Sequence, residues 1–228
     1  MSDPPLAVDI DGTITDGTDA IDPRVFEPIR TWDAPVVVAT GKALPFPVAL
    51  CQFVGISTTV VAENGGVVAV AATDEVVYLG EPDASRAAVD DYVAADHDVG
   101  WADTRFINRW RETEVNVSPE SPLEPLERAA ADHGVEVVDT GYAYHVKDPA
   151  IGKDDGIAVV AERLDLSPSS FAMVGDSAND VGAFESVGRA VAVGNADDAA
   201  RAAADEVTDE TYADGFLAAL ERLRATTP

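Results

Sequence analysis

Two acidic residues near the start of the chain have the types and spacing to do chemistry. Asp9 and Asp11 stand two positions apart, directly after the apolar run of residues 6–8, and Gly12 and Thr13 follow. Such a run indicates a strand buried on both faces, and open parallel sheets bind their ligands at the carboxyl ends of these strands. Acids placed there can hold a divalent cation, attack an electrophile or transfer a proton. Two solvated acids in a loop would give the same short pattern.

Further polar residues occupy equivalent places along the chain. One pair follows the apolar run 34–39, a lysine opens an amphipathic segment near residue 153, and a third group follows the apolar run 171–174. These residues are Thr40, Gly41, Lys153, Asp176, Asn179 and Asp180. Each alone is typical of an ordinary turn or helix start, and only their combination and order indicate a site.

The elements that must position these residues alternate between strands and helices. We expect strands at 5–9, 34–39, 58–62, 171–174 and 190–193, with helices at 23–31, 44–54, 153–164, 179–186, 197–204 and 214–224. Strand–helix–strand alternation favours right-handed crossovers and a parallel sheet. Residues 67–71 and 75–79 are expected to form a hairpin.

The middle of the chain has a different rhythm. Helices are expected at 83–95 and 122–133, with strands near 104–107, 113–117, 135–139 and 142–146 that look antiparallel. The expected fold class is therefore α/β, with a Rossmann-like parallel sheet. Residues 1–80 and 149–228 would form the catalytic core, and residues 81–148 an inserted small α+β cap.

The four polar segments together resemble the motifs of the haloacid dehalogenase (HAD) superfamily. The matching segments are residues 9–13 (Asp-x-Asp-Gly-Thr), Thr40, Lys153 and residues 175–180 (Gly-Asp-x-x-Asn-Asp). A cap between the second and third motifs resembles the type IIB (Cof-like) branch. Within that branch, residues 63–66 and 193–196 are similar to those of the archaeal phosphoglycolate phosphatases.

This resemblance implies phosphoryl transfer through a covalent intermediate. Asp9 would be the carboxylate nucleophile, since an aspartyl-phosphate divides hydrolysis into two easier steps. Asp11 would protonate the leaving alkoxide and then activate water. Thr40, with its neighbour Gly41, would contact a phosphoryl oxygen, and Lys153 would neutralise the developing charge. Asn179 would assist at the phosphate or beside the metal.

Crowded carboxylates require a cation, and oxygen ligands without a His or Cys cluster favour Mg²⁺. The expected metal residues are Asp9, Asp11 (through its backbone carbonyl), Asp176 and Asp180. The resemblance implies a small phosphate monoester as partner, namely 2-phosphoglycolate. A sugar phosphatase or mannosyl-3-phosphoglycerate phosphatase of the same branch remains an alternative. A phosphomutase and a non-catalytic phosphate- or metal-binding module also remain open.

A substrate carboxylate would need a cation from the inserted unit. The candidates are Arg105, Arg109, Arg111 and Lys147, although each arginine could instead pair with an acid such as Glu112 or Glu114. His145 is expected either to pack inside its strand or to line the cleft. Sequence leaves the choice among these residues open.

Composition excludes several classes of protein. The 228 residues carry a net charge of −27 with a pI near 4.1, which argues against nucleic acid as a partner. Many acids and only three lysines are similar to the composition of halophile proteins. The single Cys51 rules out a disulfide framework and is expected to be buried. No apolar run approaches membrane-spanning length, so we expect a cytoplasmic protein. We also expect a monomer or homodimer, although sequence does not determine which.

Overall fold

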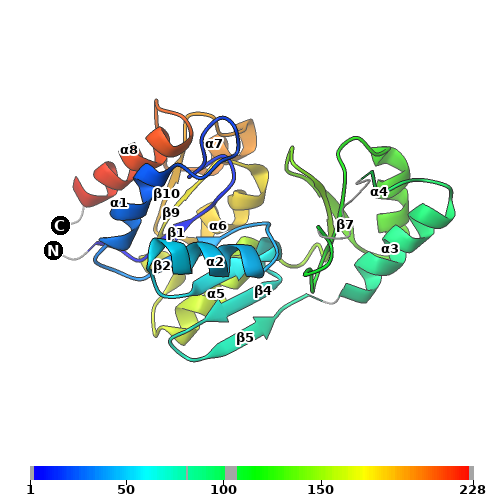
Figure 1. Cartoon of the computed structure of the whole chain (residues 1–228), viewed down its shortest axis with the longest axis horizontal. Helices are drawn as coiled ribbons and strands as arrows, with labels where there is room; N and C mark the ends of the chain where they lie inside the picture. The colour runs from blue at the N-terminus through cyan, green and yellow to red at the C-terminus, as the bar shows by residue number, and fades with distance from the viewer. Residues whose placement is uncertain (1–2, 81, 101–106, 226–228) are drawn as a thin grey trace.

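The computed structural model describes residues 3–80, 82–100 and 107–225, which form two β-sheets (Figure 1). The larger sheet has the strand order β11-β10-β9-β1-β2-β3-β4-β5. Its strands are β1 Leu6–Val8, β2 Val36–Ala39, β3 Thr59–Ala62, β4 Val67–Val70, β5 Glu75–Tyr78, β9 Ala172–Gly175, β10 Arg189–Ala192 and β11 Glu206–Val207. The strands from β11 to β3 run parallel, and β4 and β5 form the expected antiparallel hairpin at one edge.

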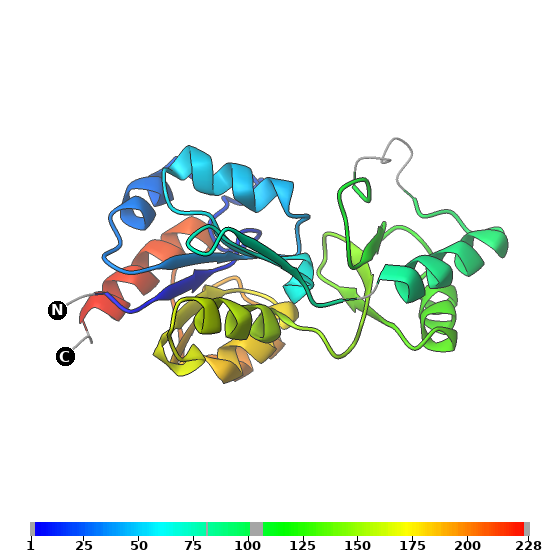
Figure 2. The same cartoon turned by 90° about the horizontal axis from the view of Figure 1, so that it is seen from below.

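Helices cover both faces of this sheet, which explains why its strands are continuous apolar runs. One face packs against α1, α2 and α8, and the other packs against α5, α6 and α7. Figure 2 shows the two helical layers on opposite sides of the strands. The helices are α1 Phe26–Arg30, α2 Pro45–Val54, α5 Lys153–Arg163, α6 Val181–Ser186, α7 Asp198–Ala203 and α8 Tyr212–Ala225.

The smaller sheet is built from the middle of the chain. It has the order β6-β8-β7, all antiparallel, and packs against two helices with a separate apolar core. Its elements are α3 Pro82–Ala94, β6 Val115–Val117, α4 Leu123–Asp132, β7 Glu136–Asp139 and β8 Tyr144–Lys147. We call these described residues between 82 and 147 the smaller unit. Its sheet lies between its helices and the larger sheet (Figure 1).

Alternation along the strands gives the smaller sheet two chemically different faces. Val117, Tyr144 and Val146 belong to the apolar core against α3 and α4. Asn116 and His145, at the alternate positions, are buried polar residues outside that core. The polar face of the smaller sheet is therefore the one directed at the larger unit.

The expected α/β architecture is confirmed, with differences at several boundaries. The segment expected to be helical from residue 23 begins as a 3₁₀ turn, and another 3₁₀ turn (Ala178–Asp180) precedes α6. The short strand β11 was not predicted. The strand expected near 104–107 falls mostly on residues 104–106, outside the described residues, and residue 107 lies in a turn. The division into a core and a cap at residues 81 and 148 stays a prediction.

Two expectations about individual segments can be compared with the structure. Cys51 is fully buried within α2, as expected from its apolar neighbours. In the described ranges 3–80, 82–100 and 107–225, none of the helices has the length and apolar character needed to cross a bilayer.

Candidate functional site

The carboxyl ends of β1 and β9 bring three of the predicted acids together. Asp9 follows β1 and Asp176 follows the last residue of β9, and the register pairs Val8 with Val174. Ligand oxygens of Asp9, Asp176 and Asp180 all lie within 4.8 Å of one another. Asp9 is only 4% exposed and Asp180 is completely buried. Three carboxylates therefore share one desolvated space at the switch point of the sheet.

Lys153 supplies the positive charge inside this space. It is the first residue of α5, its side chain is fully buried, and its Nζ lies 2.9 Å from Asp9 Oδ1 and 2.6 Å from Asp180 Oδ1. Nζ also donates to Asn179 Oδ1 at 3.2 Å. One ammonium group thus contacts two of the three clustered carboxylates.

The acids remain under-compensated despite this lysine. Burial raises the pKa of Asp9 to about 7, against the lowering effect of Lys153 and with a further increase from Asp180 and Asp11. Burial, followed by the charges of Asp9 and Asp180, raises the pKa of Asp176 to about 9. A site that disfavours its own ionised acids in this way is suited to an additional cation.

The chemistry of the donors fits a hard divalent cation. The three clustered side chains offer carboxylate oxygens, which suit Mg²⁺ better than a softer metal. Thr13 donates its hydroxyl to Asp176 Oδ1 at 3.0 Å and so orients this carboxylate. Gly12 lies in the left-handed region with φ of 75°, where a Cβ atom would overlap the Asp176 carboxylate. The close approach of this loop to Asp176 therefore depends on glycine.

Asp180 is the most fully occupied of the three acids. Its Oδ1 accepts from Lys153, and its Oδ2 accepts the backbone N–H groups of Asp176 and Ser177 at 2.9 and 3.1 Å. These contacts fix both the lysine and the loop that carries Asp176. The geometry therefore gives Asp180 a positioning function in addition to its place in the acid cluster.

Asp11 lies outside the cluster of three acids. Its carboxylate is 39% exposed and pairs with Lys42 Nζ at 2.9 Å. The Lys42 ammonium also lies 5.1 Å from the ring centroid of Tyr142 in the smaller unit. Asp9 and Asp11 thus have different surroundings, since Asp9 is buried and Asp11 is partly exposed.

The remaining predicted residues lie around the same position. Thr40 is fully buried, its Oγ1 accepts from Lys42 N at 3.1 Å, and it is not part of the cavity wall that the described residues form. Gly41 and Asn179 both line the cavity. Asn179 Oδ1 also accepts from Ser177 Oγ at 2.8 Å.

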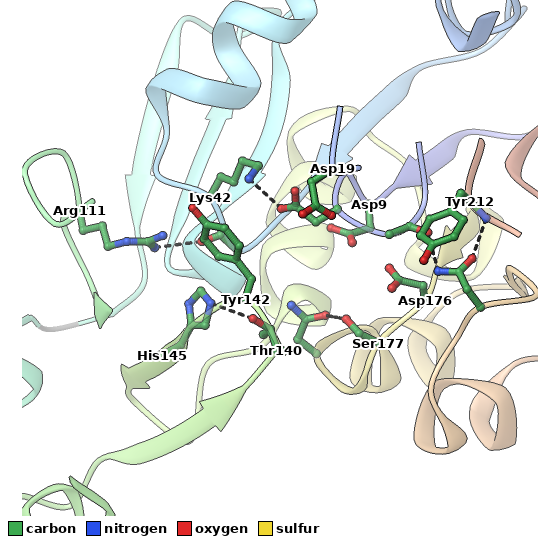
Figure 3. A pocket seen from close by; sticks show the side chains of 16 residues that line it. Asp9, Asp19, Lys42, Arg111, Thr140, Tyr142, His145, Asp176, Ser177 and Tyr212 are labelled. Atoms are coloured by element: carbon green, nitrogen blue, oxygen red, sulfur yellow. Dashed lines mark hydrogen bonds and ion pairs between the residues drawn. The ribbon is translucent and has the colours of Figure 1, made fainter. Parts of the chain in front are cut away.

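A cavity of about 300 Å³ joins this site to the smaller unit. The larger unit contributes Asp9, Asp11, Gly12, Asp19, Gly41, Lys42, Asp176, Ser177, Asn179, Asn195 and Tyr212, and the smaller unit contributes Arg111, Thr140, Gly141, Tyr142 and His145. Figure 3 shows Arg111, His145 and Tyr142 on one side and the acids Asp9 and Asp176 farther along the cavity. Acidic side chains of the larger unit and Arg111 of the smaller unit therefore border one space.

The candidate cations of the smaller unit separate into distinct environments. Arg111 lines the cavity, is buried, and forms an ion pair with Glu114. Arg109 is exposed and does not line this cavity. Lys147 pairs with Glu136 at 2.7 Å and lines a second cavity, and Arg105 lies outside the described residues.

Glu114 is the centre of a buried ionic cluster facing the cavity. Its Oε1 contacts Arg111 and lies 2.8 Å from His145 Nδ1. Burial raises the pKa of this carboxyl, but His145, Arg111 and hydrogen bonds from His145 and Asn64 outweigh that effect and lower its pKa to about 2. His145 is both packed within β8 and part of the cavity wall, so its two expected placements coincide.

A strained turn after β3 completes the site and was missed as a functional element. Glu63 and Asn64 have φ of 51° and 53°, and both are buried. Such backbone costs non-glycine residues roughly 1–3 kcal/mol each and tends to occur at functional sites. Glu63 accepts from the backbone N–H groups of Glu112 and Thr113 at 2.8–3.0 Å. Two consecutive polar residues at the end of an apolar strand were the available signal.

Comparison with known proteins identifies the family. A model of the haloacid dehalogenase-like hydrolases matches residues 6–97 and 127–220. The chain belongs to this family. A relative from Natronomonas pharaonis named phosphoglycolate phosphatase is 56% identical over 96% of this chain and 97% of its own length. A relative of the same name from Halobacterium salinarum is 54% identical over 98% and 99%, respectively.

Solved structures of similar fold agree with this membership. A Thermoplasma acidophilum protein has a TM-score of 0.86 at 23% identity, covering 98% of this chain and 99% of its own. A haloacid dehalogenase-like hydrolase from Bacteroides thetaiotaomicron has a TM-score of 0.78 at 19% identity, covering 97% and 100%. These likenesses confirm the fold of this haloacid dehalogenase-like chain, and the smaller unit is included in it. Relatives from haloarchaeal species also agree with the halophile-like composition.

Proposed function

We propose that this protein is a Mg²⁺-dependent phosphatase that hydrolyses 2-phosphoglycolate to glycolate and phosphate. The observation that carries the proposal is the buried Asp9 carboxylate, 2.9 Å from Lys153 Nζ and facing a cavity that it shares with Asp176. The substrate is supported by full-length relatives at 54–56% identity that carry the name phosphoglycolate phosphatase. The reaction class is supported by the family itself.

In the first step, the Asp9 carboxylate attacks the phosphorus atom of the substrate. A phosphorus–oxygen bond to Asp9 forms while the bond to the glycolate oxygen breaks, and Asp11 gives its proton to that oxygen. Asp11 then takes a proton from water, which attacks the aspartyl-phosphate, releases phosphate and restores Asp9. The side chain of Asp11 is 39% exposed, which supports this exchange with water.

The phosphoryl oxygens need donors and positive charge, because their negative charge is redistributed in the transition state. We assign that task to Lys153, with its buried ammonium group, and to the loop of Thr40 and Gly41. Asn179 lines the cavity that Asp9 and Asp176 share, and its side-chain oxygen accepts a hydrogen bond from Lys153 Nζ.

The metal would be held by Asp9, Asp176 and the backbone carbonyl of Asp11, with Asp180 adjacent. When bound, Mg²⁺ supplies positive charge that favours the ionised acids and the phosphoryl group. Lys153 and Asp180 would keep Asp9 and Asp176 in place around it through their hydrogen bonds.

The smaller unit would act as a cap that selects the substrate, with boundaries at residues 81 and 148. Arg111 and Lys42 are the arginine and the lysine among the described residues that line the cavity of the site, and we assign the substrate carboxylate to them. Arginine binds carboxylates through two parallel hydrogen bonds, which suits a small acidic ester. A cytoplasmic location and a monomeric or homodimeric state stay predictions.

The test is hydrolysis by the purified protein in molar KCl with Mg²⁺. We expect 2-phosphoglycolate to be preferred over a panel of sugar phosphates and phosphoglycerates. A tenfold or greater preference for a sugar phosphate would replace the proposed substrate with that of a sugar phosphatase.

The covalent mechanism is tested separately with Asp9→Asn. We expect turnover to fall by about 10⁴-fold or more, as for loss of a nucleophile, and the wild type to show one added phosphoryl group by mass spectrometry after rapid quenching. Asp198→Asn is the matched control, because Asp198 is exposed in the first turn of α7. Ordinary turnover by Asp9→Asn would refute the mechanism.

A further inference from the structure

Asn64 links the buried ionic cluster of the smaller unit to Lys153. Its side chain is 2% exposed and lies between the two units, on the strained turn after β3. Asn64 Nδ2 donates to Glu114 Oε2 at 2.9 Å, and Asn64 Oδ1 accepts from Asn179 Nδ2 at 2.9 Å. Asn179 Oδ1 in turn accepts from Lys153 Nζ at 3.2 Å. These side chains thus form a continuous hydrogen-bonded path from Glu114 to the lysine.

Glu114, at the end of the path away from Lys153, determines how the amides of Asn64 and Asn179 are oriented. An ionised carboxylate only accepts hydrogen bonds, so Glu114 requires the amide nitrogen of Asn64 to face it. The Asn64 oxygen must then face Asn179, whose amide nitrogen donates to it. The Asn179 oxygen is left facing Lys153 and the Ser177 hydroxyl.

Reversal of the Asn179 amide would place an N–H group against the lysine ammonium. Reversal of the Asn64 amide would favour that change, because it would turn the Asn64 nitrogen toward the Asn179 nitrogen. Two donors facing one another repel, and the fully buried Lys153 ammonium cannot turn to solvent instead. The Asn179 orientation that supports Lys153 is therefore the one that Glu114 favours. Rotation of both amides becomes easier once Glu114 is withdrawn.

Glu114 reaches Asn64 only when the two units are docked. Arg111, its ion-pair partner, donates to the backbone carbonyl of Gly41 at 2.9 Å. Glu63 accepts from the backbone of Thr113, one residue before Glu114, at 2.8 Å. The same contacts that hold the smaller unit on the larger one therefore place Glu114 on Asn64.

We propose that Asn64 is a positioning residue that makes the phosphate-binding placement of Lys153 depend on docking of the smaller unit through Glu114. This inference rests on the proposed phosphatase function of the site. The turn at residues 63–65 is then the element through which the smaller unit affects the reaction, in addition to any direct contact between that unit and the substrate.

The direct test exchanges the amide at position 64 and the carboxylate at position 114. Asn64→Asp places a carboxylate against Glu114, and we expect kcat/KM to fall by about 10²-fold, as for a small misplacement of a reacting group. In the double variant Asn64→Asp with Glu114→Gln, the amide introduced at position 114 would donate to the carboxylate introduced at position 64. That carboxylate would still accept from Asn179. We expect the double variant to regain at least about tenfold of the loss.

A second variant guards against failure to fold. Asn64→Gly suits the φ of 53° and removes the amide, so it should fold and lose about tenfold in kcat/KM. Asn108→Ala is the matched control, because Asn108 makes two hydrogen bonds to the Asn116 backbone within the smaller unit and lines neither cavity. We expect this control to lower thermal stability while its kcat/KM stays within about threefold.

The outcomes separate this inference from the proposed function. Rates are measured with 2-phosphoglycolate and with p-nitrophenyl phosphate, and the affinity for inorganic phosphate in the presence of Mg²⁺ is measured by calorimetry. Hydrolysis of the aryl ester alone would overturn the proposed substrate and leave the comparison of variants intact. If neither ester is hydrolysed, phosphate affinity decides: weakening in Asn64→Asp and recovery in the double variant support the inference. Unchanged Asn64→Gly, or a double variant no better than Asn64→Asp, overturns it.

Discussion

Addition of Mg²⁺ should raise the thermal stability of this protein strongly, and Asp176→Asn should abolish that response. Both the added Mg²⁺ and the substitution act on the acid cluster, where ligand oxygens of three carboxylates lie within 4.8 Å of one another beside Lys153. A cation that binds only the folded state at 100 times its Kd stabilises that state by about 2.7 kcal/mol. For a domain of this size, each kcal/mol corresponds to roughly 2–4 °C in Tm. We therefore expect an increase of about 5–10 °C.

The same variant should have the opposite effect without the metal. Burial and the charges of Asp9 and Asp180 raise the pKa of Asp176 to about 9 in the folded protein, while the ordinary value is 3.8. An acid whose folded pKa is raised costs stability as pH rises above its unfolded pKa, until the folded pKa is reached. At pH 7, that cost is on the order of 4 kcal/mol, so Asp176→Asn should be more stable than the wild type in EDTA.

The assay is thermal unfolding at fixed KCl, between pH 5 and 9, in EDTA and in a Mg²⁺ series. The wild type in EDTA should lose stability as pH rises across this range, and Mg²⁺ should restore it. Asp198→Asn removes an exposed acid and serves as the control, with a normal Mg²⁺ response expected. An equal Mg²⁺ response in Asp176→Asn, or no response in the wild type, would refute the assignment of the acid cluster as the cation site.

Three further outcomes follow from individual contacts. Lys153→Met leaves buried acids without their cation and should cost about 3–5 kcal/mol in urea unfolding at pH 7, with loss of phosphatase activity. The folded pKa of Glu114 is about 2 against an ordinary 4.5, so its ionised form should add about 3 kcal/mol to the free energy of unfolding, and this is lost as pH falls from about 4.5 to 2. In Glu114→Gln, the free energy of unfolding should lack this part of its decrease with falling pH. Gly12→Ala, at φ of 75° and against Asp176, should weaken Mg²⁺ affinity in calorimetry, and unchanged affinity would contradict the close packing of that loop.

The acid cluster could be predicted from sequence because the physics that builds it is local. A strand buried on both faces must be a continuous apolar run, so the point where polar residues resume marks the carboxyl end of the strand. Right-handed crossovers then bring such ends to one edge of the sheet. This reasoning was enough to place Asp9 and Asp176 at one edge of the sheet, and their strands are adjacent in the structure. The roles expected of them came from the family resemblance.

The path through Asn64 could not be predicted in the same way. Asn64 and Glu114 are 50 positions apart and lie in different units, so no periodicity connects them. The orientation of an asparagine amide depends on all of its partners at once, and the partner that sets it here belongs to the smaller unit. Elements with few residues were also missed: β11 has only two, which is too short for a hydrophobic period to be seen.

The scarcity of lysine gives a final reason to regard these contacts as functional. A chain with a net charge of −27 is solvated by its acids and does not need lysine at its surface. Its three lysines all pair with acids beside the two cavities: Lys42 with Asp11, Lys147 with Glu136, and Lys153 with Asp9 and Asp180. Salt screens exposed charges within about 10 Å at 0.1 M, but screens buried pairs much less. High salt would stabilise so acidic a surface by screening its charges. The buried ion pairs of Lys153 would remain almost unscreened, so the site would retain its charge interactions.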